Sequence, residues 1–419
     1  MKHFYELCDC IKDQCHPATS GASVYVGLEH IDGGVFLLKR QGRPSDVHSA
    51  KNCFLKGDIL YGKLRPYLDK AVIATDKGIC STDILVFRPK PNVCGAYLLG
   101  LVHSAEFRMH ADQTTNGVNH PRTSWGGLAS IKWDVPEKPE QEKIAATVWT
   151  IQRAIETEAK LLSSARDLKQ STMNMLFTQG MRGEKSIETE VGSLPECWTC
   201  KSLGEVSEIT YGAQAAVASA LDPSIGTPIF TNINITNAGK ISLEKLRYYK
   251  IPEHQRDRLT LKKGDVLFNW RSGSADHVGK TAIFDLDGEY TYSSFILRFR
   301  VRNDVTNEFL YRYLHYIKSQ GFFSNRRNVS SINSVFNASL AATIPIYFPA
   351  EADEQNEIVA ILKTLDRKIS LHERKHASLS DLFQTLLHQL MTAQIRVDKL
   401  DIDTSEVAKL AGQPESEPS

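Results

Sequence analysis

Two long stretches of the chain carry apolar residues at helical spacing. In residues 137–185 these positions are Ile144, Val148, Ile151 and Ile155, then Leu162, Leu168 and Met175. In residues 351–396 they are Ile358, Leu362, Leu365 and Ile369, then Leu379, Leu382, Leu386 and Leu390. The steps of 4, 3, 4 and 7 residues from Ile144 to Leu162 are typical of the buried seam of a coiled coil. Each stretch therefore predicts one helix of about 40 residues, about 60 Å long at 1.5 Å per residue.

The stretches before these helices have a different pattern, with short apolar runs separated by turn residues. The runs at 24–28, 58–61 and 84–87 predict strands, and 96–109 predicts a helix. Residues 186–350 have the same character, with a helix expected at 308–318. We therefore expect two α+β modules, one at 1–136 and one at 186–350, each followed by a long helix.

The two halves of the chain repeat each other. Glu-Gln-Glu-Lys-Ile at 140–144 recurs as Glu-Gln-Asn-Glu-Ile at 354–358, an offset of 214. Lys-Gly-Asp-Ile-Leu-Tyr at 56–61 recurs at 263–268, and Ile-Leu-Val-Phe-Arg at 84–88 recurs at 296–300, with offsets of 207 and 212. Because the helices keep register and the modules drift, we expect a fixed frame that carries variable loops.

An isolated helix with one apolar stripe is unstable in water. We therefore expect the two helices to bury their stripes against each other. The chain returns through a whole module between them, which favours an antiparallel pair with one module at each end of a rod. The expected interface consists of Ile144, Val148, Ile151, Ile155, Ile358, Leu362, Leu365 and Ile369.

Composition limits the possible classes. At 419 residues, 42% hydrophobic and 24% charged, the chain suits a soluble protein of two or three domains. Its net charge of +1 means that any contact with nucleic acid must use local basic patches. The chain has no apolar run of 18 residues and no signal-peptide core, so we expect a cytoplasmic protein. Residues 397–419 are acidic and contain Pro and Ser, and we expect a disordered tail there.

Catalytic and metal-binding patterns are weak. The run 273–281 has five residues between its glycines where a phosphate-binding loop has four, and a strand rather than a helix is expected after it, so a hairpin is favoured. Cys8, Cys10 and Cys15 beside His16 fit no standard zinc pattern, and the C-x-x-C at Cys197 and Cys200 lies on a proline-led lead-in rather than at a strand-to-helix turn. The repeated Asp58 and Asp265 fit turn chemistry before a strand better than a catalytic pair. We therefore predict no catalytic residue and no metal site.

Basic and amide residues gather in equivalent loops of the two modules. One loop follows each Gly-Asp strand and a second precedes each closing strand. Arg and Lys grip phosphates and read guanine, and Asn reads adenine, so these loops favour DNA contact over ordinary solvated loops. The candidate residues are Lys63, Arg65, Asn116, Asn119, Arg122, Asn269, Arg271, Lys280, Arg326, Arg327 and Asn333.

These features together resemble the specificity subunit of Type I restriction–modification enzymes. The resemblance covers residues 1 to about 396. It rests on the helix starts at 137–141 and 351–355, on Lys-Gly-Asp in each module, and on Leu-Pro-Glu-Cys-Trp at 194–198. The first module departs from the pattern, because it lacks that lead-in and begins at Phe-Tyr-Glu-Leu.

The resemblance implies a fold of the α+β class, with two pseudo-repeated α/β target recognition domains separated by a long antiparallel two-helix coiled coil. It implies domain 1 at 1–136, its helix at 137–185, domain 2 at 186–350, its helix at 351–396 and the tail at 397–419. Each domain would read half of a bipartite asymmetric site, and the coiled coil would set the spacer. Two modification subunits with S-adenosylmethionine, and restriction subunits with ATP and Mg, would bind the chain.

Two other classes stay open on the sequence. One is a coiled-coil scaffold whose modules bind protein, which predicts binding that is insensitive to DNA sequence. The other is a self-sufficient nuclease or methyltransferase, which the missing motifs disfavour.

Overall fold

The computed structural model describes residues 1–214, 221–272, 277–302, 304–325, 334–335 and 337–410. The chain divides into two compact units. Unit 1 comprises Met1–Leu162 with Leu371–Ser419, and unit 2 comprises Ser163–Ser370. Both units combine sheets and helices, so the fold belongs to the predicted α+β class. Among the helices of the described ranges, none is long and apolar enough to cross a lipid bilayer.

Unit 1 is built on two four-stranded sheets. The first has the order β2-β9-β6-β7, with bounds Cys8–Ile11, Ile84–Pro89, Ile59–Gly62 and Ala71–Ile73, and all its pairs are antiparallel. The second has the order β3-β5-β8-β4, with bounds Gln14–Cys15, Lys51–Phe54, Gly78–Cys80 and Tyr25–Val26. Strand β1 (Lys2–His3) pairs with β10 (Lys132–Trp133) and ties the start of the module to its end.

Three helices complete this module: α1 (Gly95–His103), α2 (Ala105–Gln113) and α3 (Trp125–Leu128). The single helix expected at 96–109 is therefore two. The break falls at Ser104, whose backbone is extended and whose side chain accepts a hydrogen bond from the Phe107 amide. A serine in this position starts a new helix because its oxygen satisfies an otherwise free N–H group.

Unit 2 repeats the first sheet strand for strand. Its order is β14-β21-β17-β19, with bounds Ser207–Tyr211, Ile296–Val301, Val266–Asn269 and Thr281–Ile283. The smaller sheets are β16-β15-β20 (Arg247–Tyr249, Thr227–Phe230, Thr291–Tyr292), β13-β23 (Thr199–Ser202, Pro345–Phe348), β11-β12 (Ser186–Thr189, Gly192–Pro195) and β18-β22 (Arg271–Ser272, Ser334–Val335). Its helices are α5 (Leu203–Val206), α6 (Arg256–Leu259), α7 (Asn307–Ser319), α8 (Phe322–Asn325) and α9 (Ala338–Ala342).

The repeated aspartate is a structural element in both units. Arg88 donates two hydrogen bonds to Asp58, of 2.9 and 2.8 Å, and Arg300 donates two to Asp265, of 2.8 and 2.7 Å. Both aspartates are buried, and each also accepts a backbone N–H from the turn before its strand. The repeated Gly-Asp and Phe-Arg segments therefore recur because they form one buried ion pair that joins the two central strands.

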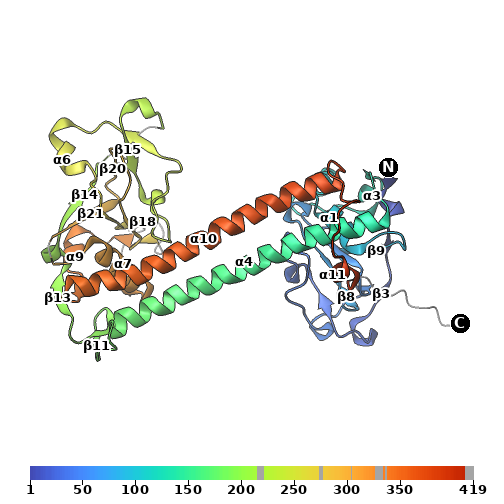
Figure 1. Cartoon of the computed structure of the whole chain (residues 1–419), viewed down its shortest axis with the longest axis horizontal. Coiled ribbons are helices and arrows are strands. Elements are labelled where there is room, and N and C mark those ends of the chain that lie inside the picture. The colour runs from blue at the N-terminus through green and yellow to red at the C-terminus, as the bar shows by residue number, and fades with distance from the viewer. Residues whose placement is uncertain (215–220, 273–276, 303, 326–333, 336, 411–419) are drawn as a thin grey trace. The chain divides into compact units, whose positions relative to one another are not determined.

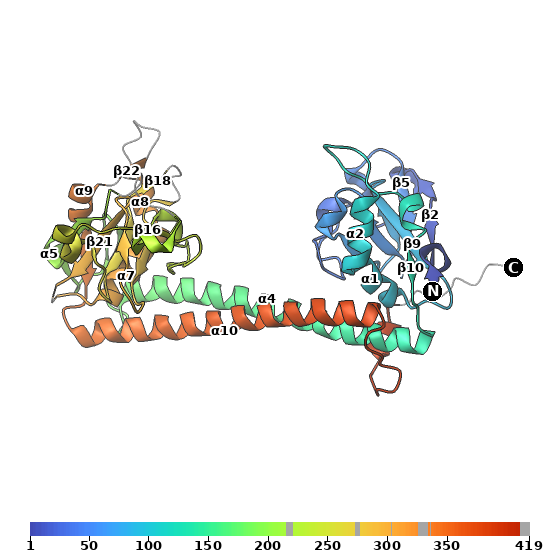
Figure 2. The ribbon, with the colours of Figure 1, turned by 90° about the horizontal axis from the view of Figure 1, so that it is seen from above.

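The long helices are α4 (Lys138–Gln179) and α10 (Ala352–Met391). They lie side by side within each unit (Figures 1 and 2). In unit 1, Arg396 beyond the end of α10 binds Glu140 at the start of α4, while His372 and Lys375 bind Glu158 further along. In unit 2 the Lys169 ammonium lies 2.6 Å from Asp366. The helices therefore run antiparallel within each unit.

The expected apolar quartets do not pack on each other. Ile144 and Val148 belong to a core of unit 1 that includes Leu390 near the end of α10. Ile358 and Leu362 belong to a core of unit 2 that includes Phe177 near the end of α4. The reason is the antiparallel direction, which brings the start of each helix beside the end of the other. Ile151, Ile155 and Leu365 are half-buried, and Ile369 is buried.

In the middle of α4, the residues buried at the helix seam differ from those that the sequence pattern predicts. Leu168 is 49% exposed and Met175 is 51% exposed. The buried positions of α4 there include Glu158 and Ala165, which are seven residues apart, and Glu158 is bound by His372 and Lys375 of α10. The predicted seam is therefore wrong where a polar residue is buried between the helices, because the prediction used apolar residues alone.

The tail expected to be disordered is folded over its first part. Val397 and Val407 are buried in the core of unit 1, and α11 (Ser405–Ala408) follows (Figure 1). Two valines that cover apolar surface outweigh the acidic residues between them. Residues 411–419 of this prediction lie outside the described residues.

Candidate nucleic-acid interface

The predicted loops leave the same strand end in both units. The Lys63 amide, just after β6, donates to the Asp83 carbonyl, just before β9, at 2.9 Å. The Trp270 amide, just after β17, donates to the Phe295 carbonyl, just before β21, at 3.3 Å. The backbone therefore fixes Lys63 and Trp270 as equivalent positions, and likewise Asp83 and Phe295.

A second backbone crossing follows at once in each unit. Leu64 forms an antiparallel bridge with Arg122, and Arg271 in β18 pairs with Val335 in β22. Each crossing carries one arginine, on the returning segment in unit 1 and on the outgoing segment in unit 2. Both modules therefore carry one arginine at this crossing, but the arginine lies on opposite segments of the pair in the two modules.

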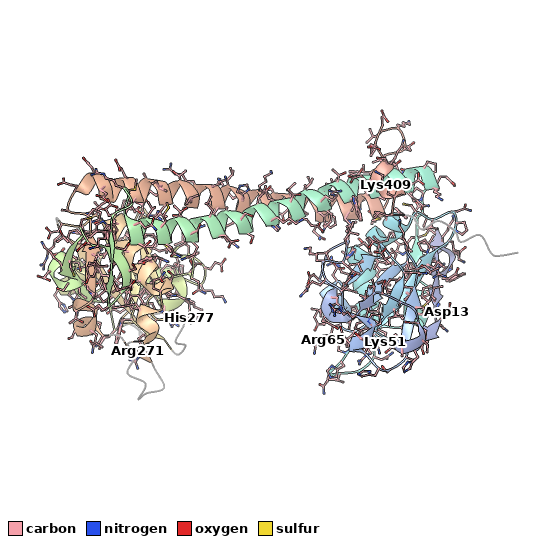
Figure 3. The ribbon with its side chains drawn as sticks, turned by 90° about the horizontal axis from the view of Figure 1, so that it is seen from below. Asp13, Lys51, Arg65, Arg271, His277 and Lys409 are labelled. Carbon is pink, nitrogen blue, oxygen red and sulfur yellow. The ribbon has the colours of Figure 1, made fainter. Side chains whose placement is uncertain are left out.

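Arg65 starts a tight turn in unit 1. Its φ is +52°, its amide donates to the Pro121 carbonyl at 2.8 Å, and its side chain is exposed. Figure 3 draws it on the part of unit 1 away from helices α4 and α10. A left-handed backbone at a non-glycine residue costs free energy and is held here by the crossing loop.

The loop that contains Asn116 and Asn119 is a narrow hairpin. The amides and carbonyls of Asn116 and Arg122 exchange two hydrogen bonds of 2.9 and 3.0 Å, and Gly117 takes the φ of +97° that the turn needs. Asn116 and Asn119 are exposed, and Val118 at the tip is 99% exposed. The hairpin is therefore a projecting element with a rigid base.

Arg122 is held by a carboxylate. Its Nε and Nη2 donate to the two oxygens of Asp83 at 3.0 and 3.2 Å, and Lys63 Nζ lies 3.9 Å from the same carboxylate. The Arg122 hydrogen bond lowers the pKa of Asp83, and Asp83 in turn raises the pKa of Arg122. Asp83 thus stays ionised at neutral pH and holds two of the predicted cations.

Arg271 is held by an aromatic ring. Its Cζ lies 5.7 Å from the centroid of the half-buried Phe295 ring, within cation–π range. The neighbouring Trp270 donates its indole N–H to the Ser294 carbonyl at 2.7 Å and meets Tyr211 edge to face. Figure 3 draws Arg271 and His277 on the part of unit 2 away from the long helices.

Two predicted DNA contacts are wrong. Asn269 is fully buried as the last residue of β17, and its Nδ2 donates to the His277 carbonyl at 2.9 Å. Lys280 is buried across the same hairpin, where burial and the nearby Lys318 lower its pKa. The strand continues one residue further than the sequence pattern indicated, so both side chains close the hairpin instead of facing solvent.

Arg326, Arg327 and Asn333 lie outside the described residues, as do residues 273–276 of the phosphate-loop-like run. Beyond those, Gly279 donates to the Asn269 carbonyl and β19 pairs antiparallel with β17. The strand predicted after this run is therefore confirmed. Within the described ranges, no three His, Cys, Asp or Glu side chains are grouped as metal ligands would be.

The sequence reasoning missed Asp83 and Phe295. A signal for both existed, because each residue immediately precedes the repeated segment at 84–88 or 296–300. Residue type alone does not indicate either position, because one residue is acidic and the other apolar.

A frame repeated in two units, with basic loops that differ at equivalent strand ends, defines a two-module recognition protein. Residues 195–381 match the family described as Type I restriction modification DNA specificity domain. The chain is 22% identical to the Type I restriction enzyme MjaVIII specificity subunit of Methanocaldococcus jannaschii over 78% of this chain and 76% of that protein. It is 21% identical to the EcoKI specificity subunit of Escherichia coli over 77% and 71%.

Solved structures share the fold. A chain solved in work on complex assembly and conformational transition of the type I R-M system has a TM-score of 0.59 at 19% identity, covering 94% of this chain and 97% of that one. The type I restriction–modification S subunit of M. genitalium has a TM-score of 0.59 at 14% identity, covering 93% and 95%. Residues 195–381 thus match a type I DNA specificity domain, and the chain is similar over most of its length to specificity subunits of type I restriction enzymes.

Proposed function

We propose that each module reads one half of a bipartite, asymmetric DNA site. In this proposal α4 and α10 set the spacer between the half-sites, and the chain directs adenine methylation and cleavage by partner subunits. One observation carries the proposal. The central sheet and its buried Asp–Arg pair recur in both units, while the loops at the equivalent strand ends present different side chains.

The loop residues suit duplex DNA. The exposed Arg65 and Arg122 and the half-buried Arg271 offer guanidinium groups for guanine edges or phosphates, and the exposed Asn116 and Asn119 offer amides that pair with adenine. A protein with a net charge of +1 must concentrate such groups locally if it is to bind DNA. The divergence of these loops between units then gives each half-site its own sequence.

The long helices also offer surfaces for partner subunits. Leu168 and Met175 in unit 2 are seven residues apart on α4 and exposed, and Leu371 and Leu382 on α10 are exposed in unit 1. Burial of these apolar side chains would be favourable, so the two faces suit contact with another helix. We assign these faces to two modification subunits, which would carry S-adenosylmethionine. Restriction subunits with ATP and Mg would complete the assembly.

The test is genome-wide mapping of adenine methylation. Cells making this chain with its co-encoded methyltransferase are compared with cells from which the chain is deleted. Loss of a split motif, two short half-sites around a fixed gap, is the expected result. Unchanged methylation would contradict the proposal and favour a protein scaffold, which pull-down of bound partners would then identify.

The spacer role has a separate test. Inserting one heptad at equivalent points of α4 and α10 should lengthen the gap in the methylated motif and keep both half-site sequences. The matched control replaces one heptad of each helix by seven different residues with the same apolar pattern. An unchanged gap in the lengthened chain would show that the helices do not set the spacing.

A further inference from the structure

Asp83 and Phe295 occupy the same position in the two modules. Each directly precedes the strand that closes the central pair, β9 or β21, and each offers its backbone carbonyl to the residue that leaves the neighbouring strand. Their side chains have opposite chemistry, one a carboxylate and the other an aromatic ring. Yet each lies against one arginine of the basic loop, Arg122 or Arg271.

In unit 1 the contact fixes one edge of the guanidinium. Asp83 takes Nε and Nη2 of Arg122, so the end of the group that carries Nη1 is turned away from the carboxylate. The remaining contact there is a 3.4 Å hydrogen bond from Nη1 to the carbonyl of His120 in its own loop. An arginine held along one edge can still donate from its two terminal nitrogens to O6 and N7 of guanine.

In unit 2 the contact fixes the face of the guanidinium. The Phe295 ring lies beneath Cζ of Arg271, and a ring contact of this kind consumes none of the N–H donors. Trp270 is anchored to Ser294, which fixes the backbone from which Arg271 projects. Holding a flexible side chain before binding reduces the entropy lost when it meets a base.

We propose that the residue directly before β9 or β21 is a positioning residue. Asp83 orients Arg122 and Phe295 orients Arg271, so that one arginine in each module reads guanine. The inference rests on the proposed DNA-recognition function and deepens it. It identifies the same frame position as a determinant of specificity in both half-sites. The chemistry at that position differs, so the approach of the arginine differs between the half-sites.

The experiment maps methylation by the complete chain with its methyltransferase, for Asp83→Ala and Phe295→Leu. Asp83→Ala should relax one position of one half-site by about tenfold and leave the other half-site unchanged. Phe295→Leu should do the same at the other half-site. Phe295→Tyr keeps the aromatic face beneath Arg271 and should keep the parent motif, whereas Phe295→Leu keeps an apolar side chain and loses that face.

Two controls separate positioning from general damage. Asp13→Ala removes a carboxylate from an exposed position of unit 1, drawn apart from Arg65 in Figure 3, and should leave the motif unchanged. Melting temperatures of all variants are compared with the parent. If Asp83→Ala unfolds the chain, Asp83→Asn, which keeps the shape and loses the charge, replaces it.

Three outcomes would overturn the inference. The first is an unchanged motif in both variants while Arg122→Ala and Arg271→Ala relax it. The second is weaker methylation at every site with the same preferred sequence, because this identifies the arginines as phosphate contacts. The third is relaxation of both half-sites by one variant. Absence of any split motif with the parent chain would instead contradict the proposed function.

Discussion

The glutamine that opens each long helix joins that helix to its module, and its replacement gives a quantitative test. Gln355 is 1% exposed and accepts the Thr306 amide at 2.8 Å, while its Nε2 donates to the carbonyls of Pro349 and Asp304 at 3.0 and 3.1 Å. Gln355→Ala removes three hydrogen bonds worth about 1 kcal/mol each, so unfolding of unit 2 should become about 3 kcal/mol easier. For a unit of about 200 residues this is a loss of about 6–12 °C in melting temperature.

The assay combines calorimetry with hydrogen exchange of the complete chain. Thr306 caps α7, so Gln355→Ala should lose amide protection in Asn307–Ser319 while Gly95–His103 keeps it. Gln141→Ala is the matched variant, because Gln141 makes the same three kinds of contact in unit 1 and should give the opposite pattern. A melting shift under about 2 °C, or equal loss of protection in both helices, would refute the reasoning.

A third variant tests the direction of the bonds. Gln355→Glu keeps the acceptor for Thr306 but turns a second oxygen toward the carbonyls of Pro349 and Asp304, so the pKa of the new carboxyl should rise on folding. Stability linked to a raised carboxyl pKa is present at low pH and lost as pH rises through it. The free energy of unfolding of Gln355→Glu should therefore rise relative to that of the parent as pH is lowered from about 8 to about 5. A flat difference over this range would contradict the assigned donor.

The remaining predictions concern buried charge and the tail. Asp265→Ala leaves Arg300 without its carboxylate and should lower the free energy of unfolding of unit 2 by about 3 kcal/mol in urea. Under the proposed function, the half-site assigned to the other module should stay unchanged. A hydrogen bond with His372 lowers the pKa of Glu158, so the stability that the Glu158 carboxylate contributes is lost as pH falls through the acidic range. The urea midpoint of Glu158→Gln should therefore fall less than that of the parent between about pH 5 and about pH 3. Val407→Asp puts a charge into the core of unit 1 and should lower its melting temperature by about 6 °C or more in calorimetry, whereas an unaffected Val407→Asp chain would restore the disordered-tail prediction.

The sequence predicted the frame well because the frame is repeated. Segments that recur at nearly constant offsets lie in or near α4, α10, the central strands and helix α7. Their function within the frame could not be predicted in the same way. Asp58 and Gln141 act through partners about 30 and 47 residues away, and no local pattern indicates such contacts.

The loop predictions failed where residue type and exposure diverged. Asn269 and Lys280 have the chemistry of DNA contacts, but hairpin pairing buries them. Asp83 and Phe295 lack that chemistry and hold the arginines instead. Tertiary packing decides which polar side chains reach solvent, and composition of a loop does not report it.

The polar residues in the seam have a consequence for alignment of the helix pair. A seam of leucines repeats every seven residues, so two such helices can slip by one heptad with little loss of apolar contact. Glu158 prevents this, because it is buried and bound to His372. A slip of seven residues in either direction would set its carboxylate against Leu365 or Leu379. The pair therefore has one preferred alignment, and we expect lengthening of one helix alone to be opposed where lengthening of both is tolerated.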